Sequence, residues 1–78
     1  MPTLLRIDGY RFFCYAGDHD EPPHIHVRTS NNEAKFWLVP VRLQSNQGFS
    51  AKELNRIQRL IETNQPDLME KWDEFFRD

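Results

Sequence analysis

The chain is poor in cysteine and has no long apolar segment. Cys14 is the only cysteine in 78 residues, so a disulfide within the chain is excluded. Secreted domains of this size usually contain several disulfides, which makes the cytoplasm the expected compartment. No stretch approaches the ~20 apolar residues of a membrane-spanning helix, and the start of the chain lacks the apolar core of a secretion signal. We therefore expect a cytoplasmic protein that does not contact a membrane.

Familiar catalytic motifs are absent as well. The chain has no glycine-rich phosphate loop, no Cys-x-x-Cys pair and no serine in a nucleophile elbow. A net charge of −2 argues weakly against a domain dominated by nucleic-acid binding. The charge is unevenly distributed, because residues 34–59 are net positive and residues 60–78 are net negative. This distribution predicts one cationic and one anionic face.

The chain is rich in aromatic side chains, which make up 13% of its residues. Their large buried area allows a compact core in a small protein. We expect residues 1–78 to form a single domain, with any binding site on a face, at an edge or between two chains.

Two hairpins are expected in the first half of the chain. Asp8-Gly9 separates two β-type segments and is typical of a type I′ turn, and Ser30-Asn31-Asn32 forms a second turn. The predicted strands cover residues 3–7, 10–15, 24–29 and 33–39. Together they predict a four-stranded antiparallel sheet.

Two helices are expected to follow the sheet. Ser50 and Glu53 form a capping box, and Phe49 and Leu54 form a hydrophobic staple at the start of the first helix. Pro66 suits the first position of the second helix. The predicted fold class is therefore α+β, in the order ββββαα, with both helices on one face of the sheet.

The segment with the most distinctive chemistry runs from Asp18 to Val27 and contains all three histidines. Because alternate residues of a strand share a face, His24 and His26 should project together, opposite Ile25 and Val27. Their Cβ atoms would lie roughly 7 Å apart, close enough to hold one metal ion or one phosphate between two imidazoles.

Three interpretations of the histidine segment remain open. In the first, His24 and His26 bind zinc, manganese or iron together with His19 and Asp20 from the preceding acidic loop. In the second, the segment is a half-buried strand with a polar outer face, and a carboxylate orients a histidine for stability alone.

In the third interpretation, the histidines act as catalysts without a metal. His24 and His26, with His19 as a third candidate, would be the general acid and base that cleave RNA through attack of its own 2′-hydroxyl. Arg28 or Lys35 would then hold the phosphate.

A separate group of cations lies on the predicted first helix. Lys52, Arg56 and Arg59 form one stripe, and Arg42 is close to them in the sequence. They can contact the phosphates of RNA or DNA or a protein partner, although a solvated helix face has the same pattern. The aromatic residues of the second helix belong either to the core or to a partner surface rimmed by acidic residues.

Two motifs carry a family resemblance that extends over nearly the whole chain. They are Pro22-Pro23-His24-Ile25-His26-Val27 and Glu33-Ala34-Lys35-Phe36-Trp37-Leu38. They resemble a family of short bacterial proteins classed as domain of unknown function four-one-six-zero. The resemblance implies a toxin–antitoxin-like module and a cognate small protein encoded by an adjacent gene, but it implies no catalytic residues.

Two functions are therefore expected from the sequence. The first is a component of such a module, acting through its cognate protein. If this chain is the toxic member, His24 and His26 would cleave RNA or bind a metal, and the chain would be a ribonuclease or a metal-dependent hydrolase. The alternative is a non-enzymatic regulatory module that binds nucleic acid or protein through the cationic stripe and the aromatic helix. A homo-oligomer is compatible with both.

Overall fold

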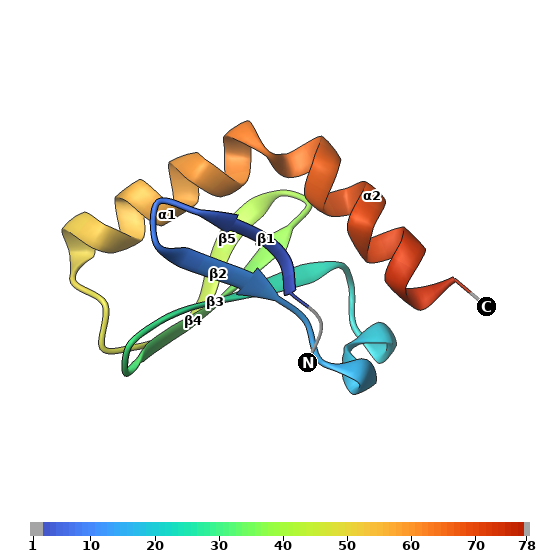
Figure 1. Cartoon of the computed structure of the whole chain (residues 1–78), viewed down its shortest axis with the longest axis horizontal. Coiled ribbons are helices and arrows are strands. Elements are labelled where there is room, and N and C mark those ends of the chain that lie inside the picture. The colour runs from blue at the N-terminus through green and yellow to red at the C-terminus, as the bar shows by residue number, and fades with distance from the viewer. Residues whose placement is uncertain (1–2, 78) are drawn as a thin grey trace.

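Residues 3–77 are described by a computed structural model. They form an antiparallel sheet followed by two C-terminal helices, which confirms the α+β class (Figure 1). The strands are β1 (Thr3–Ile7), β2 (Tyr10–Phe13), β3 (His24–Thr29), β4 (Asn32–Leu38) and β5 (Val41–Gln47). The helices are a short 3-10 helix η1 (Ala16–Asp20) and the α-helices α1 (Ala51–Thr63) and α2 (Gln65–Phe76).

The sheet has five strands, so the prediction of four strands was wrong. The strands lie in chain order, and β5 pairs antiparallel with β4 at the edge. The sequence of β5, Val-Arg-Leu-Gln-Ser-Asn-Gln, has few apolar residues, and all of its residues except Val41 are exposed. An edge strand that buries little of either face does not require alternating apolar residues, so its periodicity is weak.

Both predicted hairpin turns are present. Asp8 and Gly9 have positive φ angles of 52° and 85°, as a type I′ turn requires. A turn with Ser30 at φ 43° joins β3 to β4. The strand that was predicted to end at residue 15 ends at Phe13, and the polar loop after it contains η1.

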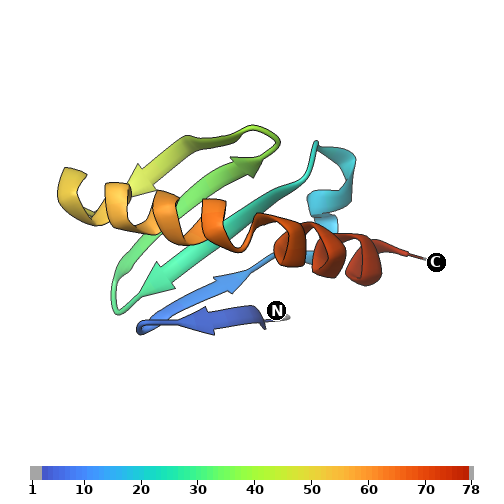
Figure 2. The same cartoon turned by 90° about the horizontal axis from the view of Figure 1, so that it is seen from above.

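The two α-helices run end to end across one face of the sheet, and α2 continues beyond the end of the sheet (Figure 2). The side-chain oxygen of Ser50 accepts a hydrogen bond from the Glu53 N–H at 3.1 Å, which confirms the predicted N-cap of α1. Among residues 3–77, no helix has both the length and the apolar character needed to cross a membrane.

The core lies between the helices and the sheet. Ile25 and Val27 are fully buried there, against Phe36, Ile57 and other apolar side chains. Because strand residues alternate, His24 and His26 lie on the opposite face, as predicted. We call this opposite side of the sheet the outer face.

Cys14 is buried after the end of β2 and has no exposed surface. Its burial, together with the nearby charge of Asp18, raises the pKa of the thiol to about 11. The thiol is therefore protonated at neutral pH and has little nucleophilic character.

Candidate metal centre

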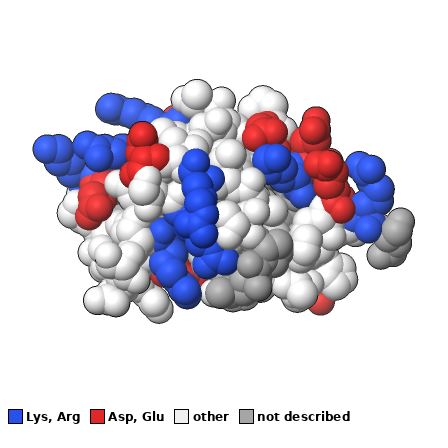
Figure 3. Space-filling model, viewed as in Figure 1, with Lys and Arg blue, Asp and Glu red and all other residues white. Residues whose placement is uncertain are grey.

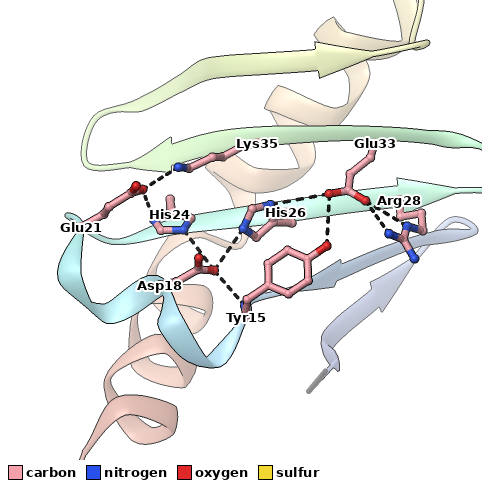
Figure 4. Close-up of polar contacts among 8 residues, drawn as sticks. All are labelled: Tyr15, Asp18, Glu21, His24, His26, Arg28, Glu33 and Lys35. Carbon is pink, nitrogen blue, oxygen red and sulfur yellow. Dashed lines mark hydrogen bonds and ion pairs between the residues drawn. The ribbon is translucent and has the colours of Figure 1, made fainter.

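Two imidazoles and one carboxylate converge on the outer face of β3 (Figure 4). The Nε2 atom of His26 lies 3.0 Å from Asp18 Oδ2, and the Nε2 atom of His24 lies 3.1 Å from the same oxygen. One potential ligand atom from each residue lies within 4.8 Å of the other two. This is the spacing expected of three side chains that share one metal ion.

The carboxylate comes from η1, which the sequence presents as a loop. The Tyr15 N–H donates to Asp18 Oδ2 at 2.8 Å, and the Glu21 N–H donates to the Asp18 carbonyl at 3.1 Å. These bonds close one short helical turn around Asp18. The turn holds the carboxylate against β3 instead of leaving it in solvent.

His24 is fully buried, and its two ring nitrogens have different surroundings. Its Nδ1 atom lies 2.9 Å from the carbonyl oxygen of Pro22. A carbonyl oxygen only accepts, so Nδ1 carries the proton and donates. Its Nε2 atom makes no hydrogen bond with the described residues.

A buried nitrogen without a hydrogen bond costs on the order of 1–3 kcal/mol, so it requires an explanation. An imidazole whose Nδ1–H is held by a backbone carbonyl, and whose Nε2 lies beside a carboxylate, has the arrangement of a metal-binding histidine. The surroundings of His24 Nε2 are therefore those of a ligand atom.

His26 is the more accessible imidazole, with 9% of its surface exposed. Burial lowers its pKa from the ordinary value, and this effect outweighs Asp18, which acts to raise it. A lowered pKa favours the neutral ring, which is the form that binds metal. Its Nδ1 atom lies 3.9 Å from Glu33 Oε2, and Glu33 is held by Arg28 at 2.6 Å.

Asp18 is favoured in its ionised form. Burial acts to raise its pKa, but the Tyr15 N–H and the two nearby imidazoles together outweigh this effect, so the pKa is lowered. The site thus combines an ionised carboxylate with at least one neutral imidazole at neutral pH.

Acid should therefore destabilise the metal-free protein. Unfolded His26 takes up a proton near pH 6.5, whereas the folded ring resists protonation, so the free energy of unfolding should fall below about pH 6.5. The slope for one proton approaches ~1.4 kcal/mol per pH unit, and Asp18 should add to the loss only near pH 4. Urea unfolding at pH 5, 6 and 7 measures this slope. His26→Gln should flatten it, and an unchanged slope in that variant would contradict the assignment.

Aromatic rings enclose the histidines. The His24 ring lies 5.0 Å from the ring of Trp72 and 5.7 Å from that of Trp37. Phe13 stacks on His26 at 5.4 Å, and Tyr15 packs edge-on against it at 4.7 Å. This cover excludes water and strengthens electrostatic interactions at the site.

The site opens beside His26. A hollow of about 110 Å³ is lined there by His26 and by residues of β4 and β5, including Glu33, Lys35, Ser45 and Gln47.

Lys35, which the sequence suggested as a phosphate ligand, forms an ion pair with Glu21 at 2.5 Å. Arg28, the other suggested phosphate ligand, is paired with Glu33.

The structure places two predicted metal ligands outside the group. The His19 side chain is 60% exposed and lies 3.4 Å from Asp20, whose own side chain is 84% exposed. The His19 ring contacts Phe76 instead of the other histidines. Asp18, rather than Asp20, is the carboxylate beside His24 and His26.

The remaining predicted binding residues lie on other elements. Arg42 is exposed on β5, and Lys52, Arg56 and Arg59 are exposed on α1, where they line a surface hollow of about 380 Å³. Sequence reasoning did not select Tyr15, Glu33 or Trp72 for the site. Tyr15 and Glu33 flank the histidine segment as polar residues, but nothing in the sequence places Trp72 against His24.

A family model matches residues 9–73, which include the site and most of both α-helices. The chain belongs to the family described as Domain of unknown function (DUF4160). Neither the curated proteins nor the solved structures contain a significant match. What the DUF4160 domain does must therefore be inferred from its geometry.

Proposed function

We propose that the DUF4160 domain binds one divalent metal ion through Asp18, His24 and His26. The observation that carries this proposal is the buried Nε2 atom of His24, which makes no hydrogen bond with residues 3–77 and lies 3.1 Å from Asp18. Coordination by a cation would give this buried nitrogen the partner that it lacks.

The ligand set indicates which metals fit. Two imidazole nitrogens and one carboxylate oxygen suit zinc, manganese or iron. Three protein ligands leave a coordination position for water or a substrate, and a bound ion of this kind acidifies that water. Within this chain, Pro22 fixes the tautomer of His24, Tyr15 orients Asp18, and the aromatic rings exclude water from one side.

The same geometry does not favour RNA cleavage by the two histidines alone. A phosphate placed between the Nε2 atoms would meet the ionised carboxylate of Asp18. His24 also has no exposed surface with which to reach a macromolecular substrate. A metal-dependent hydrolase, including a ribonuclease, therefore fits the site better than acid–base catalysis without a metal.

Metal content tests the proposal directly. Untagged protein should contain close to one equivalent of zinc, manganese or iron by elemental analysis, or should bind one equivalent in a chelator-competition titration. His24→Ala should lose this metal because it removes a ligand. His19→Ala is the matched control, since it removes an exposed histidine from the same segment and should keep the metal.

Two results would refute the metal site. One is wild-type protein that binds none of the three metals at micromolar concentrations. The other is His19→Ala protein that loses as much metal as His24→Ala. Circular dichroism separates loss of ligand from loss of fold, and the better-exposed ligand His26, replaced by Gln, provides a second variant if His24→Ala does not fold.

We retain the cognate protein partner of a toxin–antitoxin-like module as a second proposal, supported by the family resemblance alone. Co-expression with the protein encoded by the adjacent gene tests it. Growth inhibition by one member that the other relieves is the expected result, and copurification of the two chains would support a direct contact. The proposal fails if neither member affects growth.

A further inference from the structure

Three arginines form a row across three neighbouring strands of the outer face. Arg6 of β1 lies directly opposite Arg11 of β2, and Arg11 lies directly opposite Arg28 of β3. Residues paired in this way point to the same side of a sheet, and neighbouring strands lie ~4.8 Å apart. The row therefore extends ~10 Å across the sheet. Figure 3 shows Lys and Arg side chains gathered over β1 and β2.

The guanidinium groups of Arg11 and Arg28 are held in place. The Cζ atoms of Arg11 and Arg28 lie 4.7 and 5.4 Å from the centre of the Phe13 ring, so one buried ring supports both. The Nε–H of Arg11 donates to Thr3 Oγ1 at 2.6 Å. These contacts reduce the conformational entropy that two long side chains would lose on binding a ligand.

Among residues 3–77, the strand pairing places three cations and one carboxylate in the row. Like charges directly opposite each other in a sheet are destabilising, and this row places three cations side by side. The strand pairing continues from Arg28 to Glu33, which adds one carboxylate at the end of the row. Arg6 is exposed and forms no ion pair with residues 3–77. An anionic ligand beside Arg6 would reduce the repulsion within the row.

The row lies next to the candidate metal centre. Arg28 is two residues from His26 on β3, or ~7 Å along the strand. Phe13 contacts both parts, because it stacks on His26 and lies beneath two guanidinium groups. Glu33 joins them too, since it pairs with Arg28 and lies 3.9 Å from His26 Nδ1.

We propose that the row of Arg6, Arg11 and Arg28 binds phosphate esters and presents them to the neighbouring metal centre. Guanidinium groups match phosphate oxygens with paired hydrogen bonds. Paired hydrogen bonds of this kind suit a phosphomonoester or successive phosphodiesters of a single strand. Binding to the row is independent of the metal, whereas the presentation of a substrate rests on the proposed metal site.

Fluorescence polarisation tests the row in metal-free protein. The probe is a fluorescein-labelled single-stranded oligoribonucleotide, titrated at low salt in the presence of a chelator. Arg6→Gln and Arg28→Gln should each weaken binding about tenfold, because each removes a charged hydrogen-bond donor. Arg6→Gln should also lower the slope of log affinity against log salt by about 0.7.

Arg59→Gln is the matched control. It makes the same change of charge on exposed α1, so it should leave binding nearly unchanged. Competition by adenosine monophosphate separates the two sources of phosphate. Displacement of the probe identifies a terminal phosphomonoester, and retention identifies the diester backbone, and both support a phosphate-ester site.

The row is refuted if wild-type protein does not bind the probe at low salt, or if Arg59→Gln weakens binding as much as Arg6→Gln. His24→Ala separates this proposal from the metal site. That variant should lose metal and still bind the probe in chelator. Loss of probe binding only in the arginine variants, without any metal binding by wild-type protein, would uphold the row and refute the metal centre.

Discussion

Replacing Trp72 with alanine should lower the free energy of unfolding by about 3–5 kcal/mol. Trp72 is 6% exposed, and its ring lies 5.0 Å from His24 and 4.3 Å from Phe76. The change would leave a cavity where α2 passes the end of the sheet. A domain of 78 residues has roughly 4–12 kcal/mol of stability in total, so the loss would be a large fraction of it.

Urea unfolding followed by circular dichroism measures this loss without relying on tryptophan fluorescence. Phe75→Ala is the matched control, because Phe75 is an aromatic residue of the same helix with 36% of its surface exposed. It should cost about 1 kcal/mol or less. Equal losses in the two variants would show that Trp72 contributes no more than an ordinary surface ring.

Trp72 also connects the helices to the candidate site. Trp72 is buried, but it lies outside the main apolar cluster between α1, α2 and the sheet, and it packs against His24. His24 is therefore buried by a residue from the other end of the chain. Removing the ring should expose His24 to water, which links the stability of α2 to the environment of the proposed metal ligands.

The features that follow local rules were predictable from the sequence. The type I′ turn at Asp8-Gly9 depends on two adjacent residues, and strand alternation separates His24 and His26 from the core. A two-residue turn also fixes the register of its hairpin, so the pairing of Arg6 with Arg11 was implicit in the predicted turn.

The remaining features depend on contacts between distant segments. The pairing of Arg11 with Arg28 requires the β2–β3 register, which the intervening loop leaves undetermined in the sequence. Asp18 reaches the histidines only because a short helical turn forms around the Tyr15 N–H, and a single turn has no detectable periodicity. Sequence reasoning therefore located the strand of the site but did not identify its carboxylate.

Replacing Asp18 with asparagine should weaken metal binding by about 100-fold or more while leaving the fold intact. Asparagine has the same shape, and its side-chain oxygen can still accept the Tyr15 N–H. The variant removes the only anionic ligand from the group of Asp18, His24 and His26. Loss of an interaction that merely supports a ligand costs 10–100-fold, so loss of a ligand should cost at least as much.

Metal-linked stability gives the second measurement for this variant. Wild-type protein with metal at about 1,000 times its dissociation constant should gain about 4 kcal/mol of unfolding free energy, and Asp18→Asn should gain much less at the same concentration. Without metal, the two proteins should differ by only about 1 kcal/mol. Asp20→Asn is the matched control, because it makes the same change at a carboxylate that is 84% exposed and outside the group. If Asp20→Asn loses as much metal-linked stability as Asp18→Asn, the ion binds to the acidic loop in general and not between Asp18 and the two histidines.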